Sequence, residues 1–240
     1  MKRFYKEVTV VALTEGEAQG HWRVELDGRA IRTAGGKPQT VPTRAMAEAL
    51  AAEWAAQGEQ IDPRSLPLRD LTDFAIDAVA SDREATVEGI LPYADTDTLC
   101  YRADPDEALY KRQIAMWDPV LESLEGRLDV RFSRVSGIVH RPHPAETLER
   151  LRAELSAQDI YRLAALKMLS SLAASLVIAL EAIRPDADAE NLWRAANLEE
   201  DWQVELWGED AEATANRTAR FEAFKLAMRM AALADTSQEV

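Results

Sequence analysis

The stretch "HWRVELDGRAIRTAGGKPQTVPTRAMAEALAAEWAAQ", residues 21–57, changes its hydrophobic pattern halfway along. In residues 22–26 apolar and polar side chains alternate, and the run ends at Asp27-Gly28, a pair typical of the two-residue turn of a β-hairpin. After Thr43, a potential helix cap, apolar residues recur every four positions, as on one face of an α-helix. These residues are Met46, Leu50 and Trp54. The stretch therefore predicts a β-hairpin followed by a helix.

The rest of the chain continues this division. The first 20 residues contain an extended run, and the segments beyond Gln57 have the caps and apolar spacing of helices, separated by proline-containing connectors. We therefore predict an α+β fold. Its small β-rich N-terminal domain covers residues 1–42, with a boundary that could extend to about residue 65. The larger C-terminal domain, residues 43–240, is expected to be all-helical but for an extended stretch at residues 127–140.

The charge of the chain excludes several classes of partner. With 28 basic and 42 acidic residues the formal net charge is −14, which disfavours binding to nucleic acid or to an anionic membrane. The most apolar segment, residues 168–180, is shorter than the roughly 20 residues of a membrane span, so we expect one buried helix there. The single cysteine, Cys100, excludes an internal disulfide and fits a reducing compartment.

Signatures of enzymes and of cofactor sites are missing from the sequence. It has no glycine-rich phosphate loop, no dinucleotide fingerprint and no nucleophile elbow, so no cofactor is expected. His140 and His143 form a close pair in a proline-rich segment, but they lack a third ligand, and a surface loop is favoured over a metal site. Asp95 and Asp97 are either paired carboxylates or ordinary loop and cap residues.

The acidic stretch "LEEDWQVELWGE", residues 198–209, contains two tryptophans and carries more information. On a helical wheel that includes the preceding residues, the apolar side chains fall within one half. They are Leu192, Ala195, Ala196, Leu198, Trp202, Leu206 and Trp207. Glu199 and Gln203 lie in the middle of this apolar arc, whereas Glu200, Asp201 and Glu205 lie outside it or at its edge. Because an unpaired buried carboxylate is costly, Glu199 needs a partner, either within the chain or on another molecule.

Three interpretations of Glu199 remain open: a satisfied buried Glu–Gln pair, a contact for a partner protein, and a catalytic acid. The surroundings favour binding over catalysis. Seven acids lie between Glu199 and Glu212, and no lysine or arginine lies between Arg194 and Arg217. Acids beside exposed tryptophans suit a basic, partly apolar protein partner.

Short motifs in a fixed order resemble those of a known family, the assembly chaperones that act on the α subunit in the F(1) sector of the F-type ATP synthase. The motifs are "FYKEV" from Phe4, "LDGR" from Leu26, "VPT" from Val41, "EW-x-x-Q" from Glu53, "AID" from Ala75, "TDTLCYRA" from Thr96, "Q-x-x-x-WDP" from Gln113 and "LEEDWQVELWG" from Leu198. The resemblance spans residues 4 to about 215.

This resemblance implies a chaperone and not an enzyme, with a β-rich N-terminal and a helical C-terminal domain. Its partner would be the unassembled α subunit, whose interface it would mask until α pairs with β. The resemblance implies that Glu199, which lies in the matching motif, is a functionally sensitive residue. The residues that we expect to contact the partner are Glu199, Gln203, Trp207, Trp202, Glu205, Asp95 and Asp97.

Two alternatives remain: a carboxylate-based hydrolase that uses Glu199 with Asp95 or Asp97, and a general protein-binding domain. Mitochondrial members of the family carry a transit segment, whereas this chain starts almost at "FYKEV". We therefore expect a bacterial cytoplasmic protein, or a mitochondrial matrix protein if such a segment has been trimmed.

Overall fold

The computed structural model describes residues 1–16, 19–137 and 139–236 and divides the chain into two compact units. Unit 1 consists of Met1–Arg83, Asp159–Ala165 and Arg229–Val240, and unit 2 of Glu84–Gln158 and Leu166–Met228. Strands occur near the N-terminus and most of the remainder is helical, which confirms the predicted α+β class. The predicted domain boundary after residue 42 stays a prediction, and residues 237–240 of the predicted C-terminal domain lie outside the described ranges.

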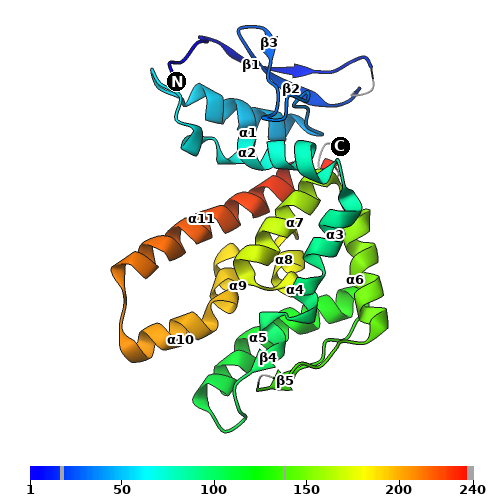
Figure 1. The fold of residues 1–240 in the computed structure, drawn as a ribbon, viewed down its shortest axis with the longest axis vertical. Helices are drawn as coiled ribbons and strands as arrows, with labels where there is room; N and C mark the ends of the chain where they lie inside the picture. The colour runs from blue at the N-terminus through cyan, green and yellow to red at the C-terminus, as the bar shows by residue number, and fades with distance from the viewer. Residues whose placement is uncertain (17–18, 138, 237–240) are drawn as a thin grey trace. The chain divides into compact units, whose positions relative to one another are not determined.

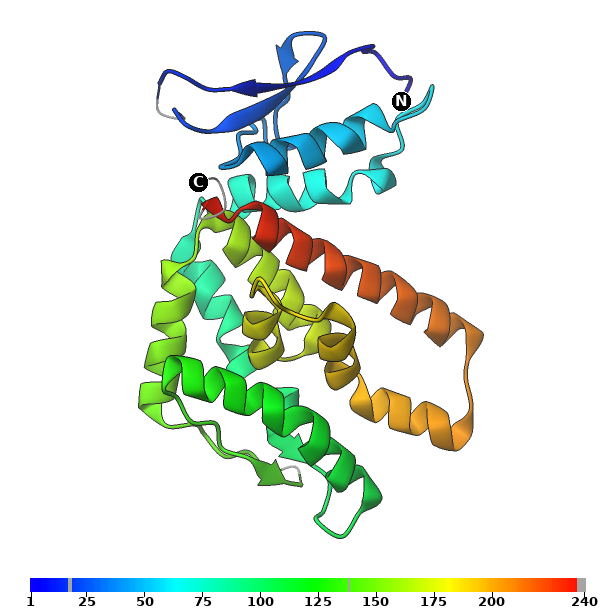
Figure 2. The ribbon, with the colours of Figure 1, turned by 180° about the vertical axis from the view of Figure 1, so that it is seen from behind.

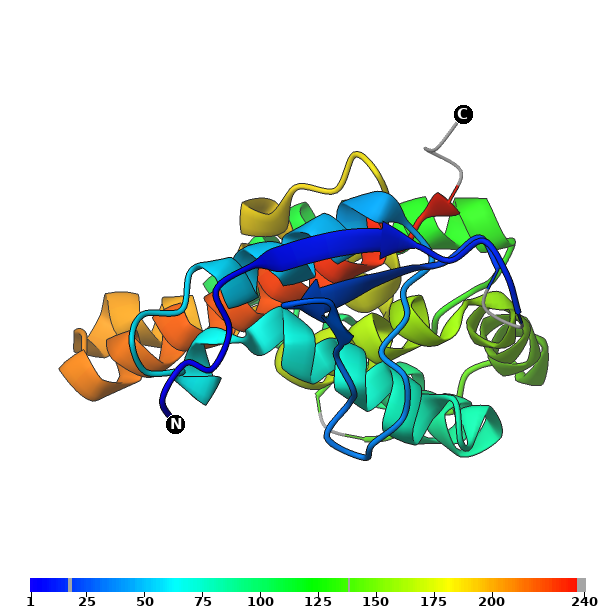
Figure 3. The same cartoon turned by 90° about the horizontal axis from the view of Figure 1, so that it is seen from above.

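Unit 1 is built on a small antiparallel sheet that lies against two helices (Figures 1 and 3). Its strands β1 (Val8–Ala12), β2 (Trp22–Leu26) and β3 (Arg29–Ala30) are arranged in the order β1-β2-β3. Asp27 and Gly28 both have positive φ, as a tight hairpin turn requires, so the predicted turn is confirmed.

The helix predicted after Thr43 is α1 (Arg44–Ala55), and it packs on β1 and β2. The Thr43 hydroxyl accepts a hydrogen bond from Met46 N at 3.1 Å, which confirms the cap, and donates one to Leu233 O at 2.5 Å. The predicted apolar stripe of α1 is buried, including Trp54. The stripe therefore forms the core of unit 1 together with the inner face of β2.

Carboxylates of two helices organise the loops of unit 1. The Glu53 carboxylate accepts hydrogen bonds from Leu68 N (2.8 Å) and Arg69 N (2.9 Å), which are unpaired donors in the first turn of α2 (Pro67–Phe74). Asp77, in the π-helical turn η2 (Ala75–Val79), accepts from Gly35 N at 2.8 Å. A short 3₁₀ turn, η1 (Pro63–Ser65), precedes α2.

Unit 2 is mainly helical. Its elements are α3 (Arg83–Ile90), α4 (Pro92–Asp95), η3 (Thr98–Cys100), β4 (Tyr101–Arg102), α5 (Ala108–Leu128), β5 (Val135–Ser136), α6 (Ala145–Ala157), α7 (Ile160–Ala173), α8 (Leu176–Ala182), α9 (Ala189–Ala196), α10 (Leu198–Trp207) and α11 (Ala211–Leu233). By contact, Arg83, the start of α7 and the end of α11 belong to unit 1. Strand β5 lies in the stretch predicted to be extended, residue 138 of which lies outside the described residues, and pairs in parallel with β4.

The apolar segment 168–180 is mostly buried, as predicted, although Ser171 and Ala174 are exposed. The prediction of one helix was wrong. Helix α7 ends at Ala173, Ala174 has a positive φ of 48°, and Ser175 caps α8 through a hydrogen bond from Ile178 N. In the described ranges no helix is both long and apolar enough to cross a membrane.

Candidate functional site: the surface of helix α10

Helix α10 is joined to α11 by a short loop that contains Gly208 (Figures 1 and 2). It contacts α5 and α9, but of its side chains only Leu198 is buried. Leu206 is 56% exposed and Trp207 is 78% exposed. We call the side chains of Glu199, Trp202, Gln203, Leu206 and Trp207 the α10 surface.

Glu199 and Gln203 both have exposed side chains, so the interpretation of a buried pair between them does not hold. The wheel also treated residues 192–207 as one helix, whereas α9 ends at Ala196 and Asn197 separates it from α10. The apolar residues of α9 that the wheel included therefore belong to another helix. On α10 itself, Leu198 is buried, Trp202 is partly exposed, and Leu206 and Trp207 are exposed. Exposed apolar side chains beside carboxylates are typical of a surface that binds another protein.

The partner of Glu199 within the chain is Gln113 of α5, not Gln203. Gln113 is fully buried and its Nε2 donates to Glu199 Oε1 at 2.7 Å, while its Oε1 accepts from Ala103 N at 2.9 Å. Part of the Glu199 carboxylate lies against protein atoms, and this desolvation raises its pKa, an effect that the Gln113 hydrogen bond only partly offsets. Gln113 therefore holds the carboxylate in a defined position.

The other acids of α10 are each paired with an arginine of α5 or α11. Arg112 Nη1 lies 2.7 Å from Glu205 Oε1, Arg220 lies 3.8 Å from Glu200, and Arg217 is in direct contact with Asp201. Arg112 also lies over the ring of Trp202, 4.4 Å from its centroid. The sequence did not indicate these arginines, because none of them lies within the acidic stretch itself.

Glu199, Trp202 and Gln203 line a depression of about 550 Å³, which we call the Glu199 pocket. Its other walls come from residues 96–109 and from Gly137. Of the described residues, its acidic lining consists of Asp104, Glu107 and Glu199, so neither Asp95 nor Asp97 is included.

The structure places Asp95 and Asp97 differently from each other. Asp97 is fully buried; its carboxylate accepts from Leu99 N at 3.1 Å and from Val177 N at 2.9 Å, so it ties η3 to the start of α8. Burial raises its pKa to about 7, because desolvation outweighs these hydrogen bonds. Asp95 is partly exposed, and its Oδ2 lies 3.7 Å from His140 Nε2. Asp97 thus has a structural role, and we do not include it in the candidate surface.

The histidine pair also divides, since His140 is exposed whereas His143 is buried. His143 accepts from Ser133 N at 3.0 Å through Nδ1 and pairs through Nε2 with Ala94 O at 2.8 Å. The predicted surface loop is therefore correct only for His140. Within the described part of the chain no group of three or more His, Cys, Asp or Glu side chains is arranged to hold a metal ion.

A sequence model of a protein family described as "ATP12 chaperone protein" matches residues 2–125, just over half of the chain. This chain belongs to the ATP12 chaperone family. The protein named "Protein atp12, mitochondrial" from Schizosaccharomyces pombe is 28% identical over 229 residues, which cover 90% of this chain and 77% of the relative. The "Protein ATP12, mitochondrial" from Saccharomyces cerevisiae is 27% identical over 250 residues, covering 83% and 74% of the two chains.

Solved structures of the ATP12 family agree with this assignment. The crystal structure of Atp12 from Paracoccus denitrificans superimposes with a TM-score of 0.91, at 35% identity and over 98% of each chain. The chain is therefore a chaperone of the family that serves ATP synthase assembly, which confirms the predicted role at this level. Membership of a chaperone family implies a role other than catalysis.

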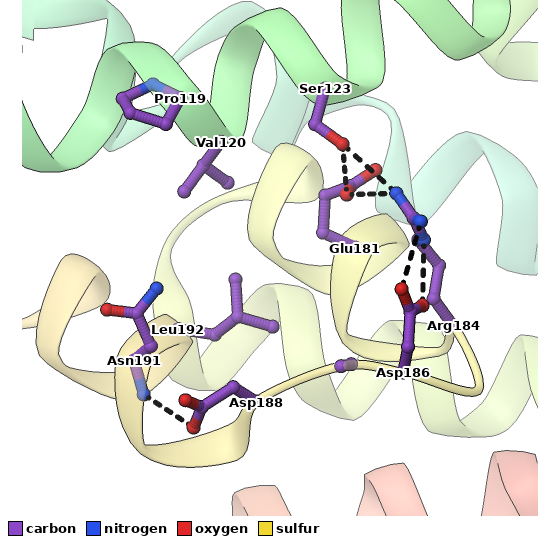
Figure 4. A pocket seen from close by; sticks show the side chains of 10 residues that line it. Pro119, Val120, Ser123, Glu181, Arg184, Asp186, Asp188, Asn191 and Leu192 are labelled. Carbon is purple, nitrogen blue, oxygen red and sulfur yellow. Dashed lines mark hydrogen bonds and ion pairs between the residues drawn. The ribbon is translucent and has the colours of Figure 1, made fainter.

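Two further depressions in this ATP12-family chain flank α10. One of about 660 Å³ lies between α10 and α11 and includes Trp207, and one of about 480 Å³ includes Leu198 and residues of α5 and α9. A smaller pocket of about 230 Å³ lies between α5 and residues 181–192 (Figure 4). There the buried Glu181 accepts from Ser123 (2.8 Å) and Arg184 (3.0 Å), so its charge serves the structure.

Proposed function

We propose that this chaperone binds the unassembled α subunit of the F-type ATP synthase through the α10 surface. It would mask the interface of α until α pairs with β. A subunit without its neighbour exposes a large apolar patch, which aggregates unless another protein covers it.

The observation that supports this proposal best is the contrast among the four acids of α10. Glu200, Asp201 and Glu205 each have an arginine partner, whereas Glu199 has no cationic partner among the residues that the structure describes. Its carboxylate is positioned by Gln113 and lies in a depression shared with Trp202. Glu199 is thus a positioned, accessible charge on a face with large exposed apolar side chains, as at the energetic centre of a protein interface.

The hydrolase alternative has little to support it. A glycosidase-type mechanism requires two carboxylates on either side of one substrate bond. Asp97 is fully buried and hydrogen-bonded to backbone donors, so it does not face a substrate from this position. The cytoplasmic or matrix location of the chain remains a proposal; the two fungal relatives are named as mitochondrial.

Affinity purification of the full chain from its native cells tests the proposal. We expect free α subunit to be the main protein that co-purifies, and to be retained by a Glu200→Gln variant. If many unrelated proteins were captured equally well, a general protein-binding domain would be the better description. If β subunit were captured instead of α, the assignment of the client would be wrong.

A further inference from the structure

The Glu199 pocket carries an uncompensated negative charge. Asp104 and Glu107 are exposed on its wall, and like Glu199 they have no cationic partner among the described residues. Arg102 also lines the pocket, but its charge is matched by Asp118, whose Oδ1 lies 2.5 Å from Arg102 Nη2. Glu107 Oε1 accepts a hydrogen bond from Asp104 N, but this contact leaves its charge unbalanced. A pocket with three carboxylates that lack a cationic partner attracts a cationic group.

One of these carboxylates is held in place by the protein core. Both ends of the Gln113 amide are used, one by Ala103 N and the other by Glu199 Oε1, and Gln113 itself is fully buried. Glu199 Oε2 has no hydrogen-bond donor within the described ranges. A carboxylate fixed through one oxygen with the other free is prepared to accept a charge-assisted hydrogen bond.

Arg102 does not offer a second contact to a ligand. Its side chain is only 5% exposed, its Nη2 pairs with Asp118, and its Nε is shielded from solvent. An incoming group therefore meets the carboxylates of the pocket and not this guanidinium.

The aromatic lining fits the same ligand. Tyr101 and Trp202 line the pocket, and Trp202 already stacks with the guanidinium of Arg112. Aromatic rings favour the flat guanidinium of arginine and pack against the aliphatic stem of lysine.

We infer that the Glu199 pocket receives a lysine or arginine side chain of the client. This inference rests on the proposed function, because the client is the α subunit. The cation would pair with Glu199, and Asp104 and Glu107 would add to the attraction without a fixed contact.

Paired variants of the full chain test the inference against purified α subunit. We expect Glu199→Gln to weaken binding at least about tenfold, and the double variant Asp104→Asn, Glu107→Gln to weaken it less. Glu200→Gln, next to Glu199 but paired with Arg220, should bind like the unchanged chain. Thermal unfolding of each variant shows whether a loss of binding comes from a loss of folding.

A photo-cross-linking residue in place of Gln203, which lines the same pocket, identifies the occupant. We expect the cross-linked α peptide to contain a lysine or arginine. Replacing that residue of α by glutamate should abolish binding to the unchanged chain, and the Glu199→Lys variant should restore it. If the unchanged chain binds α but Glu199→Gln binds equally well, the inference fails and the proposed function stands. If the unchanged chain does not bind α, both fail.

Discussion

At the scale of single residues, acidic side chains of the same chemical type have different roles in the structure. Asp97 is buried and caps two helical turns, Glu199 is exposed and held by Gln113, and Glu205 pairs with Arg112. The type of residue does not distinguish these roles. The roles are distinguished by the residues that each acid contacts, and such a residue lies up to 93 positions away in the sequence.

The buried Asp97 should make stability depend on pH. Its pKa rises from the ordinary 3.8 to about 7 in the folded chain, so the folded state binds the proton more tightly than the unfolded state does. The stabilisation is complete below about pH 4 and is lost as the pH rises through about 7. Relative to Asp97→Asn, the unchanged chain should lose up to roughly 4 kcal/mol of unfolding free energy across this range.

Denaturant unfolding of both chains from pH 4 to pH 8 measures this difference. Taking the difference removes contributions from other groups with raised pKa values, such as Glu53 and Asp73. A difference that stays constant or grows with pH would contradict the assignment.

At the scale of elements, local signals predicted the structure where local forces dominate. The Asp27-Gly28 turn, the Thr43 cap and the stripe of α1 were all visible in the sequence and are present in the structure. The break between α7 and α8 was not, because Ala174 is not a residue type that signals a left-handed conformation. The exposure of α10 could not be predicted either, since it depends on how much of the helix α5 and α9 cover.

The loop at residues 33–39 depends on Asp77, and this explains part of the "AID" motif. Asp77 accepts from Thr33 Oγ1 at 2.7 Å and from Gly35 N at 2.8 Å. A Cβ on Gly35 would lie 2.7 Å from Asp77 Cγ. The Asp77 carboxylate cannot move away without losing its hydrogen bonds from Thr33 and Gly35. Gly35→Ala should therefore lower the unfolding free energy by about 1–3 kcal/mol.

Gly126→Ala is the matched control, because Gly126 lies inside α5 and an added Cβ would meet nothing within 4 Å. We expect this variant to be as stable as the unchanged chain or more so by about 0.5–1 kcal/mol. Equal effects of the two substitutions in denaturant unfolding would refute the role given to Asp77.

The exposed end of α10 should contribute to binding and not to folding. Trp207 is 78% exposed, so Trp207→Ala should change the unfolding free energy by no more than about 0.5 kcal/mol. Its affinity for α subunit should fall at least about tenfold, as for an aromatic anchor in an interface.

The buried Trp193 provides the contrasting variant. It stacks on Phe221 at 5.6 Å, so Trp193→Ala should cost about 3–5 kcal/mol of unfolding free energy. If Trp207→Ala binds α as tightly as the unchanged chain does, Trp207 does not contribute to the binding surface.

At the scale of the whole molecule, the pattern of charge pairing is more informative than the net charge of −14. Many acidic side chains form ion pairs with arginines of the same chain, including the acids of α10 other than Glu199. The sequence and its family resemblance pointed to α10 as the candidate surface, and its role in binding stays a prediction. Among the interpretations that the sequence left open, the structure does not support a Glu199–Gln203 pair, because Glu199 is exposed and is hydrogen-bonded to Gln113.

The most direct test of the account is reconstitution with purified α subunit. When α is diluted out of denaturant, an equimolar amount of this chain should suppress its aggregation, measured by light scattering, and give a stable complex on size-exclusion chromatography. Adding β subunit should then release the chaperone. If α aggregates to the same extent with and without the chain, and no complex elutes, the proposed function is wrong.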